Sequence, residues 1–249
     1  MKISNRDKAI LISLYLSKFD TEGLKQLGFK GFIEAFNTLG YAIGVKPASL
    51  KNYRDEFDPL FPNPRKGWHK RKTREYCKVF YDKYKDWELG AFTEFIKNIV
   101  YANYDIEMLV EKISDQKKKE ETFAKRLVTG QAAEQYFKEV YNQIPIFQEW
   151  IIEDTTKLGC GFDFKLHSSS TNKFLGVEVK GLNGLSGNIA LTEKEYKVAN
   201  YLKDDYYLFI VKNFIEKPNH IFFQNPLESD LRFKKIETQI VQTSYSTNI

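Results

Sequence analysis

The spacing of the apolar residues changes at about residue 129. This change is the sequence feature that most restricts the possible folds of the chain. Before it, apolar residues recur at helical spacing, as in a helix expected over residues 5–19. After it, an amphipathic helix expected over residues 131–141 is followed by short segments with the alternation of strands. These strands are expected at residues 146–153, 162–166, 174–180, 207–212 and 220–224, with a helix at 192–203 between the third and the fourth. The pattern predicts an all-α part followed by an α/β (α+β) part with a mixed sheet.

This pattern predicts a helical domain over residues 1–90, a helical connector over 91–128 and an α/β domain over 129–249. The hydrophobic share of 42% excludes a disordered chain. Cys77 and Cys160 lie far apart in sequence and predict neither a disulfide framework nor a metal cluster. No apolar run approaches the roughly 20 residues of a membrane helix, and the first residues lack the apolar core of a signal peptide. We therefore expect a reduced, cytoplasmic protein with no membrane partner.

Positive charge is concentrated in the N-terminal half of the chain. Residues 1–128 contain 25 Lys and Arg against 18 Asp and Glu, whereas residues 129–249 contain 13 against 15. Residues 46–85 alone contain 12 basic and 5 acidic side chains, with aromatic residues between them. Such a block is typical of a surface that binds the phosphate backbone of a nucleic acid, and the alternative is an ordinary solvated surface.

Part of this block follows the plan of a helix-turn-helix unit. A helix expected over residues 31–39 is followed by a short turn and by a second helix that begins at Pro47, because proline favours the first position of a helix. In that second helix the predicted contacts to base edges are Ser49, Asn52 and Arg54. Lys51 is expected to touch phosphate. The alternative for Arg54 is a local ion pair with Asp58, four residues further along the helix.

A basic loop follows the second helix, which is ended by Pro59, Pro62 and Pro64. The predicted DNA contacts in this loop are Arg65, Lys66, Lys70 and Arg71.

Two of the predicted strands carry charged residues on one face. In residues 162–166, strand alternation places Phe162, Phe164 and Leu166 on one face and Asp163 on the other. In residues 174–180, Val177 and Val179 share one face, while Glu178 and Lys180 share the opposite one. The connection between the strands is polar, as expected for a hairpin. Pairing of the two strands would therefore bring Asp163, Glu178 and Lys180 together.

This trio suits the hydrolysis of a phosphodiester bond. Two carboxylates can hold a hard divalent cation such as Mg²⁺, which lowers the pKa of a bound water and neutralises charge on the phosphate. A neighbouring lysine can orient the attacking water and stabilise the transition state. Taken singly, each residue has a plainer explanation: Lys180 as a surface lysine, Glu178 as a charge that protects a strand edge and Asp163 as a turn residue.

Asp163 together with Glu178-Val179-Lys180 resembles the PD-(D/E)XK nuclease superfamily, although Phe162 stands where the superfamily's name has proline. More narrowly, residues 129–212 are similar to the C-terminal nuclease-like domain named after the plant protein NO VEIN. The matching segments are residues 130–134, 161–163, 177–181, 189–195 and 206–211. The resemblance implies Asp163, Glu178 and Val179 at the metal, with Glu134 as an extra acid. An ordinary helix-surface glutamate is the alternative for Glu134, and Glu195 is a further candidate acid.

The segment from Gly44 to Arg71 resembles DNA-reading segments of type II restriction endonucleases. The two resemblances imply a sequence-specific, Mg²⁺-dependent endonuclease that cleaves double-stranded DNA and defends against foreign DNA. A homodimer is expected, because one site in each chain must serve two strands. The alternative is a non-catalytic DNA-binding regulator or defence protein with an inert nuclease-like domain. The chain has no G-x-x-x-x-G-K-[ST] segment, so we expect no nucleotide cofactor.

Overall fold

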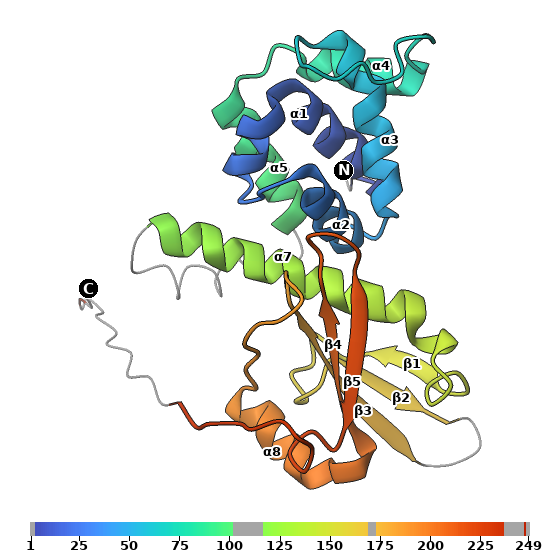
Figure 1. The fold of residues 1–249 in the computed structure, drawn as a ribbon, viewed down its shortest axis with the longest axis vertical. Coiled ribbons are helices and arrows are strands. Elements are labelled where there is room, and N and C mark those ends of the chain that lie inside the picture. Colours follow the sequence, from blue (N-terminus) through green and yellow to red (C-terminus); the bar gives the residue numbers. More distant parts are fainter. Residues whose placement is uncertain (1–2, 102–116, 169–172, 237–246, 248–249) are drawn as a thin grey trace.

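The computed structural model describes residues 3–101, 117–168, 173–236 and 247, in which a group of helices is joined to an α/β unit (Figure 1). The predicted α+β architecture with a mixed sheet is confirmed. The helices of the first part are α1 (Asn5–Gln26), α2 (Phe32–Ala42), α3 (Pro47–Phe57), α4 (Glu75–Tyr84) and α5 (Leu89–Tyr101). None of the helices in the described part of the chain is long and apolar enough to cross a membrane.

Local sequence signals explain where the first helices begin and end. The Ser4 side chain caps α1 by accepting a hydrogen bond from the backbone N–H of Asp7. The helix extends beyond the predicted end at residue 19, through a kink at Asp20, where φ is 48°. Pro47 is the first residue of α3, as predicted, and Gly44 adopts a φ of 70° in the turn before it. The helix–turn–helix order of α2 and α3 is thus present.

These helices enclose a first hydrophobic core. It is centred on buried residues of α1 such as Leu14 and Tyr15, which pack with Phe57 at the end of α3. It also takes in Phe92 and Ile96 of α5, so α5 packs with the helices of the first 90 residues. Residues 102–116 of the predicted connector lie outside the described residues.

The second part is a sheet of strands in the order β1-β2-β3-β4-β5. Their bounds are β1 (Ile151–Asp154), β2 (Phe164–His167), β3 (Phe174–Gly181), β4 (Tyr206–Lys212) and β5 (Asn219–Gln224). All neighbouring pairs are antiparallel except β3 and β4, which are parallel and are joined through α8 (Glu193–Leu202). Such a parallel pair needs a long crossover connection, which residues 182–205 provide.

The first predicted strand begins later than expected, at Ile151 and not at residue 146. Residues 144–150 form successive turns, with the N–H of Phe147 bonded to the carbonyl of Ile144 and that of Trp150 to Phe147. Ile144 and Phe147 are apolar because they are buried in the second core and not because they alternate along a strand.

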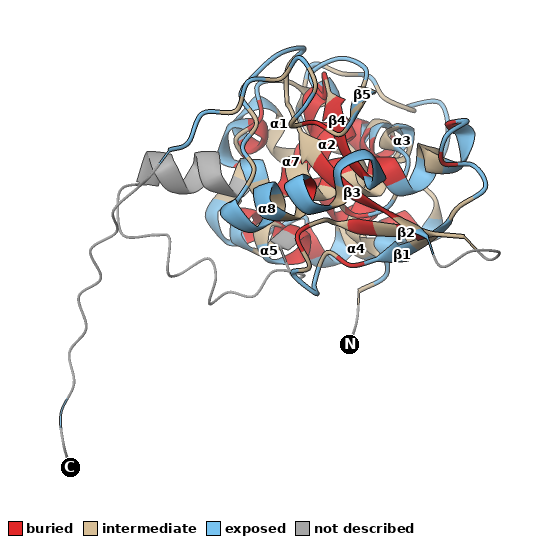
Figure 2. Cartoon of the chain, turned by 90° about the horizontal axis from the view of Figure 1, so that it is seen from below, coloured by how far each residue is buried: buried red, intermediate tan, exposed pale blue. Residues whose placement is uncertain are grey.

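Helix α7 (Lys117–Val140) covers one face of the sheet. Its Phe137 packs against Phe164 of β2 and Phe209 of β4, with ring centroids 5.1 and 4.8 Å apart. Ala133, one turn earlier, is fully buried in the same core. Buried residues concentrate in these central strands and in the helix that covers them (Figure 2).

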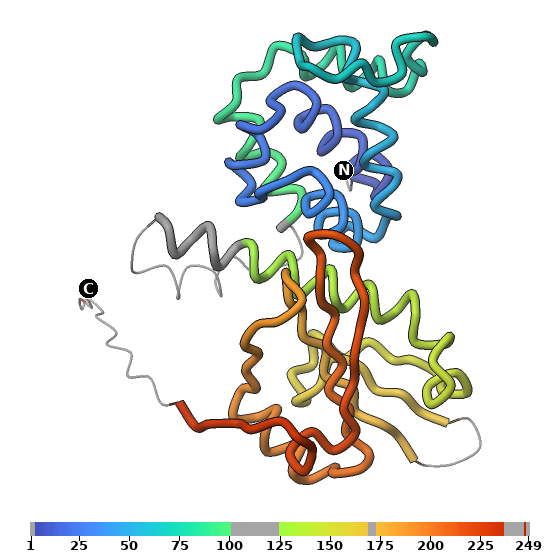
Figure 3. The backbone as a smooth tube through the Cα atoms, in the orientation of Figure 1, coloured from blue at the N-terminus to red at the C-terminus, as the bar shows by residue number. Residues whose placement is uncertain are grey.

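Helix α2 connects the two cores. The tube in Figure 3 shows the connection between β4 and β5 reaching α2. There the Asn37 side chain donates to the carbonyls of Phe214 and Glu216, at 2.8 and 2.9 Å. Glu34, one turn before, is buried and accepts from Lys125 of α7 and from Asn183, which follows β3. The first helical unit is therefore attached to the loop directly after Lys180.

Candidate active site

Asp163 lies immediately before β2, where its backbone and side chain both bind β3. Its N–H donates to the carbonyl of Val177 at 3.0 Å, and its Oδ2 accepts from the N–H of Val179 at 2.8 Å. The Thr155 hydroxyl also donates to the carbonyl of Asp163. These bonds hold the carboxylate at the edge of β3, beside the backbone that links Glu178 to Lys180.

The predicted alternation in residues 162–166 is wrong at its first residue. Phe164 and Leu166 are fully buried in the second core, as expected for one face of β2. Phe162 instead packs near Phe174 and against Gly176, away from that core. The reason is that regular pairing begins only at Phe164, so Phe162 does not follow the alternation of the strand.

The alternation predicted for β3 is present. Val177 and Val179 are buried in the second core, and Glu178 and Lys180 project to the opposite face. There the Lys180 Nζ donates to Glu178 Oε1 at 2.5 Å and to Glu195 Oε2 at 2.9 Å. Glu195 belongs to the first turn of α8, so Lys180 bridges the sheet and this helix.

Burial and mutual repulsion make the acids of this site weak. Burial, and after it the charge of Asp163, raises the pKa of Glu178. Burial also raises the pKa of Asp163, although the Val179 N–H and Lys180 oppose the increase. On α7, burial followed by the nearby Asp163 raises the pKa of Glu134 to about 8. Such carboxylates ionise readily only beside added positive charge.

The donor atoms at this site suit a hard cation. The N–H and the C=O of a residue in a strand point to the same side, so the Val179 carbonyl faces the side of the Asp163 carboxylate. In the described part of the chain, no three His, Cys, Asp or Glu side chains are grouped so that they could hold a metal ion. Mg²⁺, however, is usually held by one or two carboxylates and keeps several waters. Two acids and a backbone carbonyl therefore fit it.

The structure corrects two of the predicted DNA contacts. Arg54 is only 8% exposed, and its guanidinium donates to Asp55 at 2.8 Å. The same group lies 3.6 Å from the Asp58 carboxylate, so the alternative explanation, a local ion pair between Arg54 and Asp58, is present. Arg65 is bonded to both Asp58 and Asp20. Because their charged groups are used inside the helical unit, neither arginine is available to reach a base edge or a phosphate.

The other predicted contacts lie at the surface. Lys51, Asn52, Lys66, Lys70 and Arg71 are exposed, and Ser49 is half-buried. Lys51 is paired with Asp55 on the same helix. DNA contact by these residues remains a prediction.

The fold brings the predicted DNA contact Arg71 together with two arginines, Arg6 and Arg74, that the sequence did not single out. Arg6 of α1 lies over the ring of Tyr76 at 4.0 Å, and Arg71 lies over Trp68 at 4.0 Å. Arg74 lies between them, 4.9 Å from Tyr76 and 5.7 Å from Trp68. We call this set the arginine–aromatic surface; it consists of Arg6, Tyr53, Trp68, Arg71, Arg74 and Tyr76. Arg6 escaped notice because it lies outside the basic block, and no local pattern marks it.

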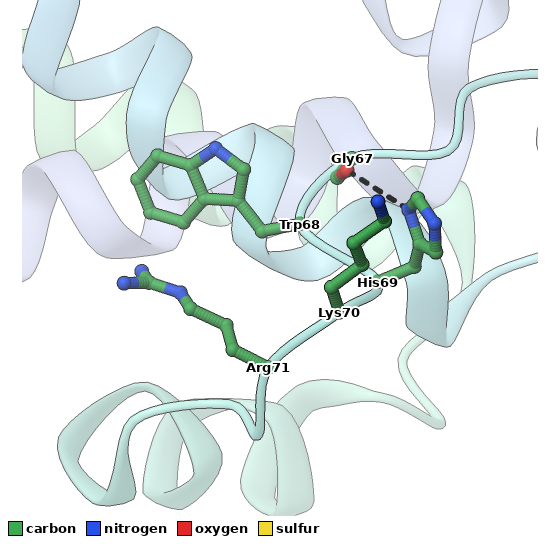
Figure 4. A pocket seen from close by; sticks show the side chains of 5 residues that line it. All are labelled: Gly67, Trp68, His69, Lys70 and Arg71. Atoms are coloured by element: carbon green, nitrogen blue, oxygen red, sulfur yellow. Dashed lines mark hydrogen bonds between the residues drawn. The ribbon is translucent and has the colours of Figure 1, made fainter.

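A hollow of about 320 Å³ lies beside this surface and is lined by residues 67–71 (Figure 4). The Lys70, His69 and Arg71 side chains surround it, and Trp68 forms one wall. It is lined by the basic loop of the helical unit and by none of the acids near Lys180. The hollow therefore belongs to the predicted DNA-binding side of the molecule.

Comparison with known proteins bears on the second part of the chain. Residues 133–223 match the family model described as "Protein NO VEIN, C-terminal". The match takes in Glu134, Asp163, Glu178, Lys180 and Glu195. No curated protein and no solved structure matches the chain. Over residues 133–223, which include β1 to β4 and β5 except its last residue, the chain is therefore similar to the NO VEIN C-terminal family, as the sequence predicted.

Proposed function

We propose that the chain is a Mg²⁺-dependent endonuclease that hydrolyses phosphodiester bonds in double-stranded DNA. One observation carries the proposal: the Asp163 carboxylate, from the segment before β2, binds the N–H of Val179, which lies between Glu178 and Lys180 on β3, and the Lys180 ammonium binds Glu178. Two buried acids with raised pKa values, that of Glu178 raised partly by the charge of Asp163, lie beside a lysine and suit an added divalent cation. The similarity to a nuclease-like family supports the same conclusion.

Each residue has a distinct role in this proposal. Asp163, Glu178 and the Val179 carbonyl would hold Mg²⁺. The cation supplies positive charge for the phosphate and a water of lowered pKa. The Lys180 ammonium donates a hydrogen bond to the attacking water and to the charge that develops on the phosphate. Glu134 adds a third acid next to Asp163 and is mostly protonated near neutral pH, because its pKa is raised to about 8, so it can donate a proton there.

DNA is held by the helical unit in this proposal. The arginine–aromatic surface supplies positive charge for the DNA backbone, most of all at exposed Arg6, because Arg71 and Arg74 also pair with the buried Glu56 carboxylate. Exposed Lys66 and Lys70 extend it. Ser49 and Asn52 of α3 would read bases in the major groove, which admits a helix in B-form DNA. The function that follows is sequence-specific cleavage of the restriction type, in defence against foreign DNA.

The decisive experiment is digestion of supercoiled plasmid with Mg²⁺ and with EDTA. We expect cleavage with Mg²⁺ only, and its loss in Asp163→Asn and Glu178→Gln while duplex binding persists. Glu153→Gln is the matched control, because Glu153 lies exposed on β1 and pairs loosely with Lys165 at 3.7 Å. Wild-type activity in either of the first two variants would refute the assignment.

The second candidate is a non-catalytic DNA-binding regulator. The observation that favours it is the absence, among the described residues, of three metal-binding side chains in one group. In the same experiment, a wild-type chain that binds duplex DNA and leaves plasmid intact with Mg²⁺ would establish this function instead.

We also propose that the chain acts on DNA as a homodimer. A single set of Asp163, Glu178 and Lys180 serves one strand at a time, and two-fold dimers match the symmetry of palindromic targets. Light scattering of the protein–DNA complex should give two chains per duplex, and plasmid should become linear without a build-up of nicked circles. A complex with one chain that first accumulates nicked circles would contradict the dimer.

A further inference from the structure

Lys180 lies between two glutamates that come from different elements. Its Nζ is 2.5 Å from Glu178 Oε1 on its own strand and 2.9 Å from Glu195 Oε2 on α8. In the proposed function Glu178 is a metal ligand, so its carboxylate cannot serve the cation and Lys180 equally. Glu195 is then the carboxylate that remains for Lys180.

Glu195 is itself held rigidly at the start of α8. Its Oε2 accepts from the N–H of Thr192 at 2.9 Å, and its own N–H donates to the Thr192 hydroxyl at 3.2 Å. This reciprocal pair is a capping box, which satisfies two backbone N–H groups at the helix N-terminus. The same carboxylate oxygen therefore binds both the helix cap and the Lys180 ammonium.

Helix α8 is in turn fitted closely to the segment that carries Asp163. A Cβ added at Gly161, two residues before Asp163, would lie 2.7 Å from the Val198 side chain of α8. One added at Gly176 of β3 would lie 3.1 Å from the Leu202 side chain. Because both glycines allow α8 to approach closely, the helix holds Glu195 in a set relation to Asp163 and β3.

We propose that Glu195 is a positioning residue of the nuclease, which holds the Lys180 ammonium toward the attacking water while Glu178 binds the metal. This inference rests on the proposed function. Glu195 acts through Lys180 and touches neither the metal nor the DNA. This role requires a negatively charged side chain that extends to Lys180. The hydrogen bond of Glu195 to the helix cap is a separate contribution, which does not depend on the charge.

The test uses Glu195→Gln, because glutamine at this position still forms a capping box while the negative charge is lost. The matched control is Glu193→Gln in the same first turn, where the side chain is exposed and pairs with Lys197 at 2.5 Å. Single-turnover cleavage of plasmid is measured at saturating Mg²⁺, together with the melting temperature of each full-length variant. We expect Glu195→Gln to lose about 10- to 100-fold in rate with an unchanged melting temperature, and Glu193→Gln to match the wild type.

A double-mutant cycle with Lys180→Ala separates positioning from a general structural role. If Glu195 acts through Lys180, Glu195→Gln should cause no further loss of rate once Lys180 is absent. Wild-type cleavage by Glu195→Gln, or the same fold-loss in both backgrounds, would overturn the inference and leave the proposed function standing. A wild-type chain that cleaves no DNA with Mg²⁺ would overturn the proposed function, and this inference with it.

Discussion

At the scale of single residues, Asp58 explains why two predicted DNA contacts belong to the helical core. It is 1% exposed and accepts from the Ser17 hydroxyl at 2.7 Å and from two nitrogens of Arg65 at 2.9 Å. Arg54 lies on its other side. A buried carboxylate between two arginines is costly to remove, because both cations then lose their counter-charge.

We predict that Asp58→Ala lowers the free energy of unfolding by about 3–5 kcal/mol, as expected when one partner of a buried ion pair is removed. The control is Glu94→Ala, in which an exposed glutamate loses its pairing with Lys97 and little stability. Urea denaturation of both variants gives the comparison. An Asp58→Ala protein as stable as the control would show that Arg54 and Arg65 do not depend on this carboxylate.

At the scale of secondary structure elements, β5 is held against β4 partly by a histidine. The His220 ring stacks on Phe209, with centroids 4.8 Å apart, and its Nδ1 is 3.2 Å from the Tyr136 hydroxyl. Burial lowers the pKa of His220 below its usual value of 6.5. Protonation therefore favours the unfolded chain, so this contribution to stability is complete above the unfolded pKa and is lost as the pH falls through the folded one.

We predict that His220→Gln flattens the fall in melting temperature between about pH 7 and pH 5, since the variant has no histidine to protonate at this position. Glutamine keeps a polar group within reach of Tyr136. Melting curves across this pH range compare the variant with the wild type. Parallel curves for the two proteins would exclude His220 as the source of the pH dependence.

The proposed DNA-binding surface can be tested at Arg6, which lies in the first turn of α1. Arg6 is exposed and lies over Tyr76, whereas Lys25 lies exposed in the last turn of the same helix. We predict that Arg6→Gln weakens duplex binding and lowers the slope of log affinity against log salt by about one, as for the loss of one phosphate contact. Lys25→Gln should leave the slope unchanged. Anisotropy titrations at several salt concentrations measure both, and equal slopes would remove Arg6 from the surface.

At the scale of the whole molecule, α2 makes the helical unit and the sheet unit depend on each other. Buried Glu34 accepts from the Lys30 N–H, from Lys125 and from Asn183, while Asn37 binds the connection after β4. These contacts cross between the two cores and are shielded from water. We therefore expect both cores to unfold in one transition.

Glu34→Ala should separate that transition into two, because Lys125 and Asn183 lose the buried acceptor that ties them to α2. Single-tryptophan versions provide the readout: Trp87 reports on the first core and Trp150 on the second. In the wild type their fluorescence should change at the same urea concentration, and in Glu34→Ala at different ones. Coincident curves in the variant would mean that other contacts hold the two units together.

Local sequence patterns were enough to predict most of the strands, the start of α3 and one face of the site. The alternation in β3 placed Val177 and Val179 in the core and Glu178 and Lys180 opposite them, and Pro47 marked the start of α3. These predictions succeed because strand alternation and the preference of proline for a helix start are properties of the local chain. The similarity to the NO VEIN C-terminal family over residues 133–223 was visible for the same reason, since its motifs are short and local.

Which charged side chains meet depends on how distant segments pack, and the sequence did not predict it. The tertiary structure buried Arg54 and Arg65 against Asp58, brought Arg6 to Tyr76 and placed Glu195 beside Lys180. It also placed the Asp163 carboxylate against the Val179 N–H, between Glu178 and Lys180 in the chain. An arginine in a basic segment looks the same in sequence whether it faces DNA or a buried carboxylate. The difference comes from packing between segments far apart in the chain, which local periodicity does not encode.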